Sequence, residues 1–253
     1  GSGFNVMAHY GYASQRGGPE DEMRGKIMSK IGSLKMLCSH PDLLRSSAVK
    51  FKLQSGEGSS YANDLVDSGA LDGISHSPKL DYTVQYVKEF LEQDEANKVV
   101  IFATYVDMLD KLSDALGPDQ CRLYSGKLDA KTKEENKIAF NTDPAIRVLI
   151  SSDAGGYGVD LPAANLLVNY DLPWSSGAAV QRNGRIRRAS STWPSIVIQD
   201  LLIEGSIEVR QHESLQQKSS IANAIIDGEG MDKDGGVPLS VGGLKQFLAS
   251  AII

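Results

Sequence analysis

The chain has no long hydrophobic run. None of its apolar stretches approaches the roughly 18 residues that a membrane-spanning helix requires. The first residues, Gly1-Ser2-Gly3, resemble the remnant of an expression tag and do not form a signal peptide. We therefore expect a protein of the cell interior that is neither secreted nor inserted into a membrane.

Cysteine and histidine are scarce. The two cysteines, Cys38 and Cys121, are too few and too far apart for a metal centre or a disulfide framework. The histidines are scattered along the chain, with no spacing typical of metal ligands, at His9, His40, His76 and His212. The sequence therefore predicts reduced thiols and no metal site.

Positive charge is not in excess. The chain has 26 Lys and Arg against 32 Asp and Glu, and its formal net charge is −6. A protein that holds duplex DNA by a general basic coating is usually basic overall, so the composition argues against such a coating. Because phosphate contacts are local, a single basic stripe remains compatible with this charge.

A complete phosphate-binding loop is also missing. No Gly-x-x-x-x-Gly-Lys-Ser/Thr segment occurs, and Gly25-Lys26 is followed by Ile27 inside a helical pattern. The acidic pair Asp21-Glu22 has no apolar strand before it and is not expected to bind Mg²⁺. The sequence therefore predicts that this chain cannot hold a nucleotide by itself.

What the chain does contain is a regular alternation of strands and helices. Short apolar runs predict strands at 99–102, 121–124, 148–150, 166–170 and 196–202. Helical patterns cover 20–45, 129–141, 176–187, 207–226 and 241–250, and two more follow Ser77-Pro78 and precede Gly117-Pro118. This order is typical of an α/β fold with a doubly wound parallel sheet.

Two polar stretches predict linkers. Residues 54–77 are rich in Gly, Ser, Asp and Asn, and residues 227–236 are acidic and rich in glycine. The predicted domains are a helical segment at 1–53, a flexible linker or insertion at 54–77, an α/β lobe at 78–204, and a long helix, linker and short final helix at 205–253.

The residues most suited to chemistry lie in two neighbouring segments. The loop Ser151–Asp160 follows a predicted strand, and its glycines permit tight turns that bring backbone N–H groups close to a ligand. An ordinary strand-to-helix turn is the alternative. Asp160 suits either a hydrogen bond to ribose hydroxyls or a cap within the turn.

The second segment, Gln181–Arg188, holds four arginines. On a helix, Arg182, Arg185 and Arg188 would share nearly one face. Crowded guanidinium groups repel one another unless an anion compensates, and arginine binds phosphate through two parallel hydrogen bonds. A phosphate partner is therefore favoured over the alternative, a solvated basic face.

These segments resemble, in the correct order, motifs of the second RecA-like lobe of superfamily 2 helicases, and among these the Swi/Snf-type DNA translocases. The similar segments are Leu34–Leu44 with its Cys-Ser-His-Pro sequence, Lys98–Tyr105 (motif IV), Leu123–Gly126 with 133–141 (motif IVa), Ser151–Leu161 (motif V), Gln181–Arg188 (motif VI), and Gly205–Glu208 with the long helix after it. The resemblance covers most of residues 20–250. It implies a RecA-like sheet flanked by helices, preceded by a helical segment and followed by a brace helix.

The resemblance also implies a place for ATP and Mg²⁺. Both would bind between this lobe and a first RecA-like lobe of the same protein, which holds most of each. The implied catalytic residues are the arginine fingers Arg185 and Arg188, with Arg182 a close candidate. The implied nucleotide-binding residues are Gln181, Gly156, Gly158 and Asp160. The whole protein would be an ATP hydrolase, and this chain alone would be inactive.

Duplex DNA is the second implied partner. Sequence-independent phosphate contacts would come from Thr104, Ser125, Ser151 and Ser152, although local caps and turns are the alternative for each hydroxyl. The expected location is a nucleus, or the cytoplasm of a prokaryotic or phage-infected cell.

Two competing functions remain open at this point. The chain could be a stand-alone module that binds DNA or protein without catalysis, or a nucleotide- or sugar-binding α/β enzyme that only shares the sheet. Motif VI itself departs from the common Swi/Snf pattern. Its sequence Gln-Arg-Asn-Gly-Arg-Ile-Arg-Arg is closer to the general helicase form.

Overall fold

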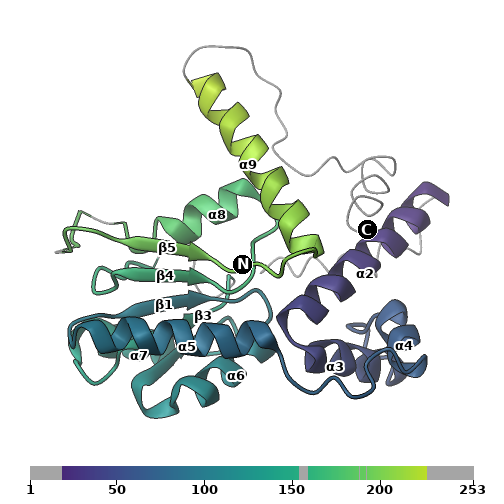
Figure 1. The fold of residues 1–253 in the computed structure, drawn as a ribbon, viewed down its shortest axis with the longest axis horizontal. Coiled ribbons are helices and arrows are strands. Elements are labelled where there is room, and N and C mark those ends of the chain that lie inside the picture. Colours follow the sequence, from purple (N-terminus) through teal and green to yellow (C-terminus); the bar gives the residue numbers. More distant parts are fainter. Residues whose placement is uncertain (1–18, 154–158, 188, 192, 227–253) are drawn as a thin grey trace. The chain divides into compact units, whose positions relative to one another are not determined.

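The computed structural model describes residues 19–153, 159–187, 189–191 and 193–226 (Figure 1). The chain divides into two compact units. One unit is Pro78–Leu202, and the other combines Gly1–Ser77 with Ile203–Ile253. The predicted second linker and the final helix at 241–250 lie outside the described residues.

The unit 78–202 is built on a five-stranded sheet in the order β2-β3-β1-β4-β5, and every pair of neighbours is parallel. Its strands are β1 (Val99–Phe102), β2 (Cys121–Tyr124), β3 (Val148–Ser151), β4 (Leu166–Asn169) and β5 (Val197–Asp200). In Figure 1 the arrows of β5, β4 and β1 point the same way. The predicted strands and the α/β class are therefore confirmed.

Helices cover the sheet on both faces. Helix α6 (Asp107–Leu116) leads from β1 to β2, and α7 (Ala130–Thr142) leads from β2 back to β3. These two connections run in opposite directions along the sheet, so right-handed crossovers place their helices on opposite faces. Helix α8 (Ser176–Asn183) leads from β4 to β5 in the same direction as α7 and lies on the face of α7.

The core on the face of α7 and α8 follows from the strand register. Val100 lies beside Leu149 and Leu167, and these side chains pack with Phe140 of α7 and with Ile186. All residues of β1, β3 and β4 are buried, as expected for central strands of a parallel sheet. Helix α5 (Pro78–Gln93) begins at the predicted proline and packs against α6.

The other unit is helical where it is described. It contains α2 (Pro19–Ser39), α3 (Pro41–Lys52), α4 (Ser60–Asp67) and α9 (Ile207–Ile226). The bounds predicted for α9 are those observed. The helix predicted at 20–45, with its apolar pattern ending at Pro41, is two helices, because His40 separates α2 from α3, which begins at Pro41. The Nδ1 atom of His40 caps α3 by accepting a hydrogen bond from the Asp42 N–H group at 3.1 Å.

Residues 54–77, predicted as a flexible linker, contain helix α4. Its cap residue Ser59 is buried, and the Ser59 hydroxyl lies 2.8 Å from that of Ser29 and 3.0 Å from that of Ser33. The backbone N–H of Ser59 donates to Ser47 Oγ at 3.2 Å. Hydroxyl contacts therefore join the start of α4 to α2 and α3, beside the buried Ala62.

None of the described helices combines the length and the apolar character that crossing a bilayer requires.

Candidate functional site

The predicted site residues gather where the strands of the sheet end. Parallel strands bring their carboxyl ends to one edge, and ligands of open α/β sheets bind outside that edge. Thr104 lies two residues beyond β1, Ser125 directly follows β2, and Ser151 ends β3. Asp153 and Asp171 lie two residues beyond β3 and β4. The edge therefore carries hydroxyl and carboxylate groups together.

Arg182 on α8 is the centre of this edge. Its Nε and Nη2 atoms donate to the two carboxylate oxygens of Asp153, at 2.5 and 2.8 Å. Its Nη1 atom donates to the backbone oxygen of Asp171 at 2.6 Å and to Asn169 Oδ1 at 3.3 Å. Nη2 also donates to Thr104 Oγ1 at 3.1 Å and lies 3.5 Å from Asp171 Oδ1. One guanidinium thus joins the ends of β1, β3 and β4.

Asp171 is the buried counterpart of this arginine, with no solvent exposure. Besides the contact with Arg182, its carboxylate accepts from the Thr104 backbone N–H at 2.9 Å and from the Thr104 hydroxyl at 2.5 Å. A carboxylate that is removed from water needs such partners, since an unpaired buried charge is strongly destabilising.

The electrostatics of the edge keep Arg182 charged. Burial opposes the charged guanidinium, but the hydrogen bonds and charges of Asp153 and Asp171 outweigh it and raise the pKa of Arg182. The guanidinium also lies over the ring of Phe102, 5.5 Å from its centre. Only 3% of the Arg182 side chain is exposed, so this charge is held inside the unit.

Arg185 lies outside the helix in which it was predicted. Helix α8 ends at Asn183, followed by Gly184, and Arg185 is in the next turn, where its N–H donates to Arg182 O at 3.0 Å. The continuous helix predicted to 187 is therefore wrong. The Arg185 carbonyl accepts from Leu161 N–H at 3.0 Å, which ties this turn to the far end of the glycine-rich loop.

The pKa of the Tyr124 hydroxyl, at the end of β2, is affected mainly by burial and only weakly by the charge of Arg185. Burial raises the pKa of the Tyr124 hydroxyl, and the positive charges of Lys137 and Arg185 oppose that rise. Arg185 is 8% exposed.

The remaining residues of the predicted nucleotide site are placed as follows. Gln181 on α8 and Asp160 at the end of the loop are exposed. Gly156, Gly158 and Arg188 lie outside the described residues.

Three of the four residues predicted to contact DNA are buried, and the fourth, Thr104, is half-buried. Ser125, Ser151 and Ser152 are 4%, 1% and 1% exposed. The Ser151 hydroxyl donates to Ser152 O at 3.1 Å, and the Thr104 hydroxyl is bound to Asp171. Lys127, which directly follows Gly126 in the same loop as Ser125, is 68% exposed and lies 3.4 Å from Asp107.

Two members of the cluster, Asp153 and Asp171, were missed by motif reasoning. They are 29 and 11 residues from Arg182, so no local spacing connects them with it. A usable signal did exist, because Asp153 and Asp171 follow predicted strands by three residues and one residue, and the carboxyl ends of parallel strands meet.

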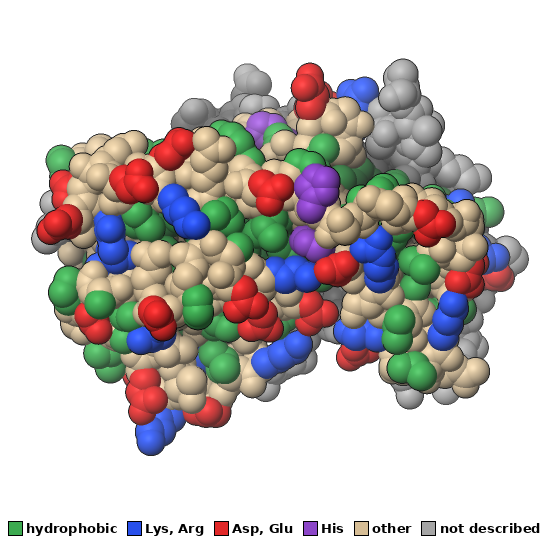
Figure 2. Space-filling view, turned by 60° about the horizontal axis from the view of Figure 1, so that its bottom comes forward, with side chains coloured by type: hydrophobic (Ala, Val, Ile, Leu, Met, Phe, Trp, Pro, Cys, Tyr) green, Lys and Arg blue, Asp and Glu red, His purple; other side chains and the backbone are tan. Residues whose placement is uncertain are grey.

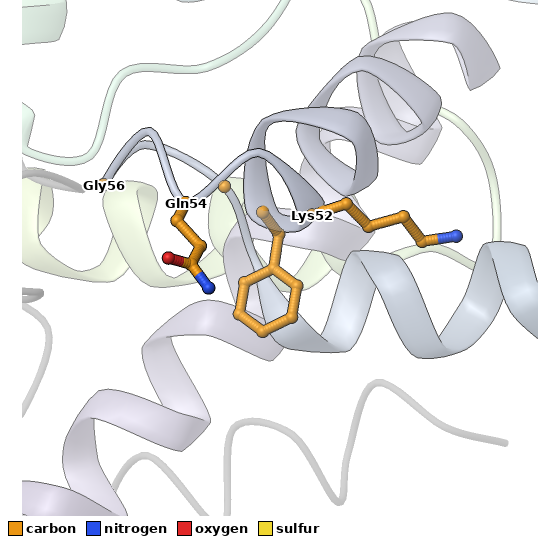
Figure 3. A pocket seen from close by; sticks show the side chains of 5 residues that line it. Lys52, Gln54 and Gly56 are labelled. Atoms are coloured by element: carbon orange, nitrogen blue, oxygen red, sulfur yellow. The ribbon is translucent and has the colours of Figure 1, made fainter.

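Other surface features lie apart from these residues. A depression of about 540 Å³ at the end of α3 is lined by Phe51, Lys52, Gln54, Gly56 and Gly58 (Figure 3), and none of the predicted site residues lines it. On the face in Figure 2, acidic and basic side chains are intermixed. Among the described residues, no three His, Cys, Asp or Glu side chains group as metal ligands would.

Residues 82–190 match the family described as the helicase conserved C-terminal domain. These residues include strands β1 to β4, and Arg182 with the residues that bind its guanidinium.

Curated relatives extend the likeness. The DNA repair and recombination protein RAD54-like of Gallus gallus is 29% identical over 244 residues, which cover 91% of this chain and 32% of the relative. The chain spans about a third or less of the length of the curated relatives it matches.

Solved structures establish the fold. The Sulfolobus solfataricus SWI2/SNF2 ATPase core in complex with dsDNA aligns with a TM-score of 0.56 and 21% identity, over 87% of this chain and 42% of that one. The C-terminal domain of the SWI2/SNF2 ATPase of the same organism aligns with a TM-score of 0.52 and 20% identity, over 73% of this chain and 74% of that one.

Proposed function

We propose that the chain is the C-terminal, RecA-like lobe of a superfamily 2 protein of the Swi/Snf type, and that it serves an ATP-driven DNA translocase. In this proposal the whole protein hydrolyses ATP in a cleft between two lobes. This chain supplies arginine fingers from one side of the cleft and sequence-independent contacts to duplex DNA. A first RecA-like lobe of the same protein supplies the phosphate loop.

One observation carries the proposal. The arginine segment and the glycine-rich loop are bound to each other at the carboxyl edge of the sheet. Arg182 grips Asp153 at the start of the loop, and the Arg185 carbonyl accepts from Leu161 at its end. The two segments that carry the proposed nucleotide-binding residues therefore form one edge, where ligands of open α/β sheets bind.

Within this edge we assign the finger role to Arg185 and Arg188. A guanidinium aimed at the phosphate that is being transferred stabilises charge in the transition state. Gln181, which is exposed on α8, and Asp160, which is exposed at the end of the loop, would orient the nucleotide together with Gly156 and Gly158.

The carboxylates at this edge do not suit Mg²⁺. This ion prefers oxygen ligands with several waters, commonly one or two carboxylates and the substrate phosphates. Asp153 is bound by Arg182 through both oxygens, and Asp171 is buried against Arg182 and Thr104. We therefore assign the Mg²⁺ ligands to the first lobe.

DNA contact is assigned to the same end of the sheet. Because Ser125, Ser151 and Ser152 are buried, we propose that they shape the loops, while backbone N–H groups and Lys127 face the phosphates. Phosphate contacts of this kind position a protein without reading sequence.

The finger assignment is tested in the full-length protein. Arg185→Ala and Arg188→Ala should each lower kcat for DNA-stimulated ATP hydrolysis by about 10³-fold, with ATP binding largely retained. Arg187→Ala is the matched control, because Arg187 is an exposed arginine of the same segment. Turnover that persists in both finger variants would contradict the assignment.

The half-site character is tested in this chain alone. The purified chain should show no ATP hydrolysis above background, with or without duplex DNA. A clear rate would mean that a complete nucleotide site lies within these 253 residues, and the two-lobe proposal would then fail.

A further inference from the structure

We propose that Arg182 is a positioning residue that fixes the glycine-rich loop to the turn of Arg185, and that it does not itself touch the nucleotide. The inference rests on the proposed function, and it separates the roles of the arginines in motif VI. The cluster of Arg182, Asp153, Asp171 and Thr104 is called the arginine junction below.

Every nitrogen of the Arg182 guanidinium is engaged inside the chain. Nε donates to Asp153, Nη1 to Asp171 O and Asn169, and Nη2 to Asp153 and Thr104. Arginine has five N–H donors, and these acceptors use all of its nitrogens. A finger must keep donors for the transferred phosphate, whereas Arg182 would first have to leave two carboxylates.

Burial points the same way. The Arg182 side chain is 3% exposed, and Asp171 beside it is not exposed at all. Moving Arg182 toward a ligand would leave the Asp171 carboxylate without its cation in a site closed to water. Removing one partner of a buried ion pair strongly destabilises a protein. Arg182 therefore keeps this position when the nucleotide is bound.

The arginine junction holds both flanks of the loop. Asp153 precedes the segment 154–160 and is gripped by the Arg182 side chain. Leu161 follows the segment and donates to Arg185 O, while Arg185 N–H donates to Arg182 O. Arg182 therefore links Asp153, before the segment, to the turn of Arg185, which binds Leu161 after it. A displacement of a catalytic group by about 1 Å is enough to lower the rate of the reaction strongly.

Lysine cannot replace Arg182 in this role. It keeps one positive charge, but its ammonium group cannot reproduce the planar fork that holds both oxygens of Asp153. Arg182→Lys therefore preserves the charge of the junction and removes its geometry. Asp153→Asn breaks the same two-oxygen contact from the other side, because an amide keeps only one acceptor oxygen and no charge, at a residue whose side chain is 34% exposed.

The test is a double-mutant cycle on turnover in the full-length protein. Arg182→Lys and Asp153→Asn should each lower kcat about tenfold or more, with the KM for ATP changed less than about threefold. The double variant should be no slower than the slower single variant, because both changes break one contact. Arg187→Lys is the matched control and should leave kcat unchanged. All rates are taken well below the melting temperature of each variant.

Three outcomes would overturn the inference. If the two losses multiply, Arg182 acts on something other than Asp153, as a finger would. If kcat is unchanged in folded Arg182→Lys, no positioning role exists. If kcat falls and KM rises only as far as the melting temperature of each variant falls, the junction contributes to stability alone. Arg185→Ala is measured in parallel. Retained turnover in Arg185→Ala would contradict the proposed function, whereas the three outcomes above contradict only the role of Arg182.

Discussion

Among single residues, Asp171 imposes the strongest requirement on its surroundings. A carboxylate with no exposure is tolerated only because Arg182 and Thr104 surround it. The ion pair itself contributes little to the free energy of folding, since desolvation offsets attraction. Removing one partner destabilises the protein strongly, because the other charge stays buried and unpaired.

The first prediction concerns the stability of the junction. Arg182→Ala should lower the free energy of unfolding by about 3–5 kcal/mol, because Asp171 is left buried without a cation. Arg187→Ala, at an exposed position nearby, should change it by less than about 0.5 kcal/mol. Urea unfolding followed by circular dichroism measures both. Equal stability of the two variants would show that Asp171 has another compensating partner.

The second prediction concerns Cys121 and pH. Burial raises the pKa of its thiol to about 11. A thiol in the unfolded chain has a pKa of about 8.5, so it ionises first as the pH rises. The folded state is therefore favoured below that value, and this contribution is lost progressively as the pH rises from about 8.5 to about 11.

Thiol modification at pH 8 checks this directly. Cys121 should react with a disulfide reagent much more slowly in the folded chain than in urea, because the thiolate is the reactive form. Cys38, which is only half-buried, provides the internal comparison, and Cys121→Ser identifies the slow site. Equally fast modification of both cysteines in the folded chain would contradict the burial of Cys121.

The residues of the site were predictable only in part. The sequence identified Arg182 and Arg185, because closely spaced arginines are conspicuous. It could not assign them different environments, since the partners of Arg182 are 11 and 29 residues away and are brought together only by the sheet. The burial of Ser151 and Ser152 likewise depends on packing and not on their own polarity.

Among the helices and strands, those with a strong local sequence pattern were predicted correctly, and those with a weak pattern were not. The strand Val99–Phe102 is a continuous apolar run, and α9 has the predicted bounds after Gly205. Helix α4 was missed because its contacts are made by small polar residues such as Ser59. Helix α8 was predicted too long because the arginine spacing suggested a helix that Asn183 in fact ends.

The third prediction tests the close packing that accompanies α4. A methyl group at Gly58 would lie 2.0 Å from the backbone N of Phe51, a distance that no side chain tolerates. Gly58→Ala should therefore destabilise the chain by about 1–3 kcal/mol through overpacking. The lining of the depression in Figure 3 should change with it, since Gly58 and Phe51 both belong to that lining.

Gly25 offers the opposite case. It lies inside α2, and a methyl group there would meet nothing within 4 Å. Gly25→Ala should stabilise the chain by about 0.5–1 kcal/mol, because alanine loses less entropy in a helix. Thermal unfolding of both variants should give shifts of opposite sign. A destabilised Gly25→Ala, or an unaffected Gly58→Ala, would contradict the backbone placement of that helix or turn.

For the whole molecule, charge limits how DNA can be bound. The formal net charge is −6, and several exposed lysines lie beside carboxylates, including Lys127 near Asp107 and Lys131 near Glu135. Electrostatic binding to duplex DNA scales with the number of phosphates that are neutralised. A lobe with this charge should therefore contact few phosphates and bind weakly without the rest of the protein.

The last prediction measures that number. The logarithm of the binding constant for duplex DNA should fall linearly with the logarithm of the salt concentration, with a small slope of about −0.9 for each phosphate contacted. The affinity should be the same for AT-rich and GC-rich duplexes. Lys127→Ala should reduce the slope by about one phosphate equivalent. Lys26→Ala is the matched control, because Lys26 is equally exposed and also paired, to Glu22. Fluorescence anisotropy titrations from low to moderate salt decide the matter. If both lysine variants lower the slope equally, the effect is one of overall charge, and if neither does, DNA does not bind beside β2.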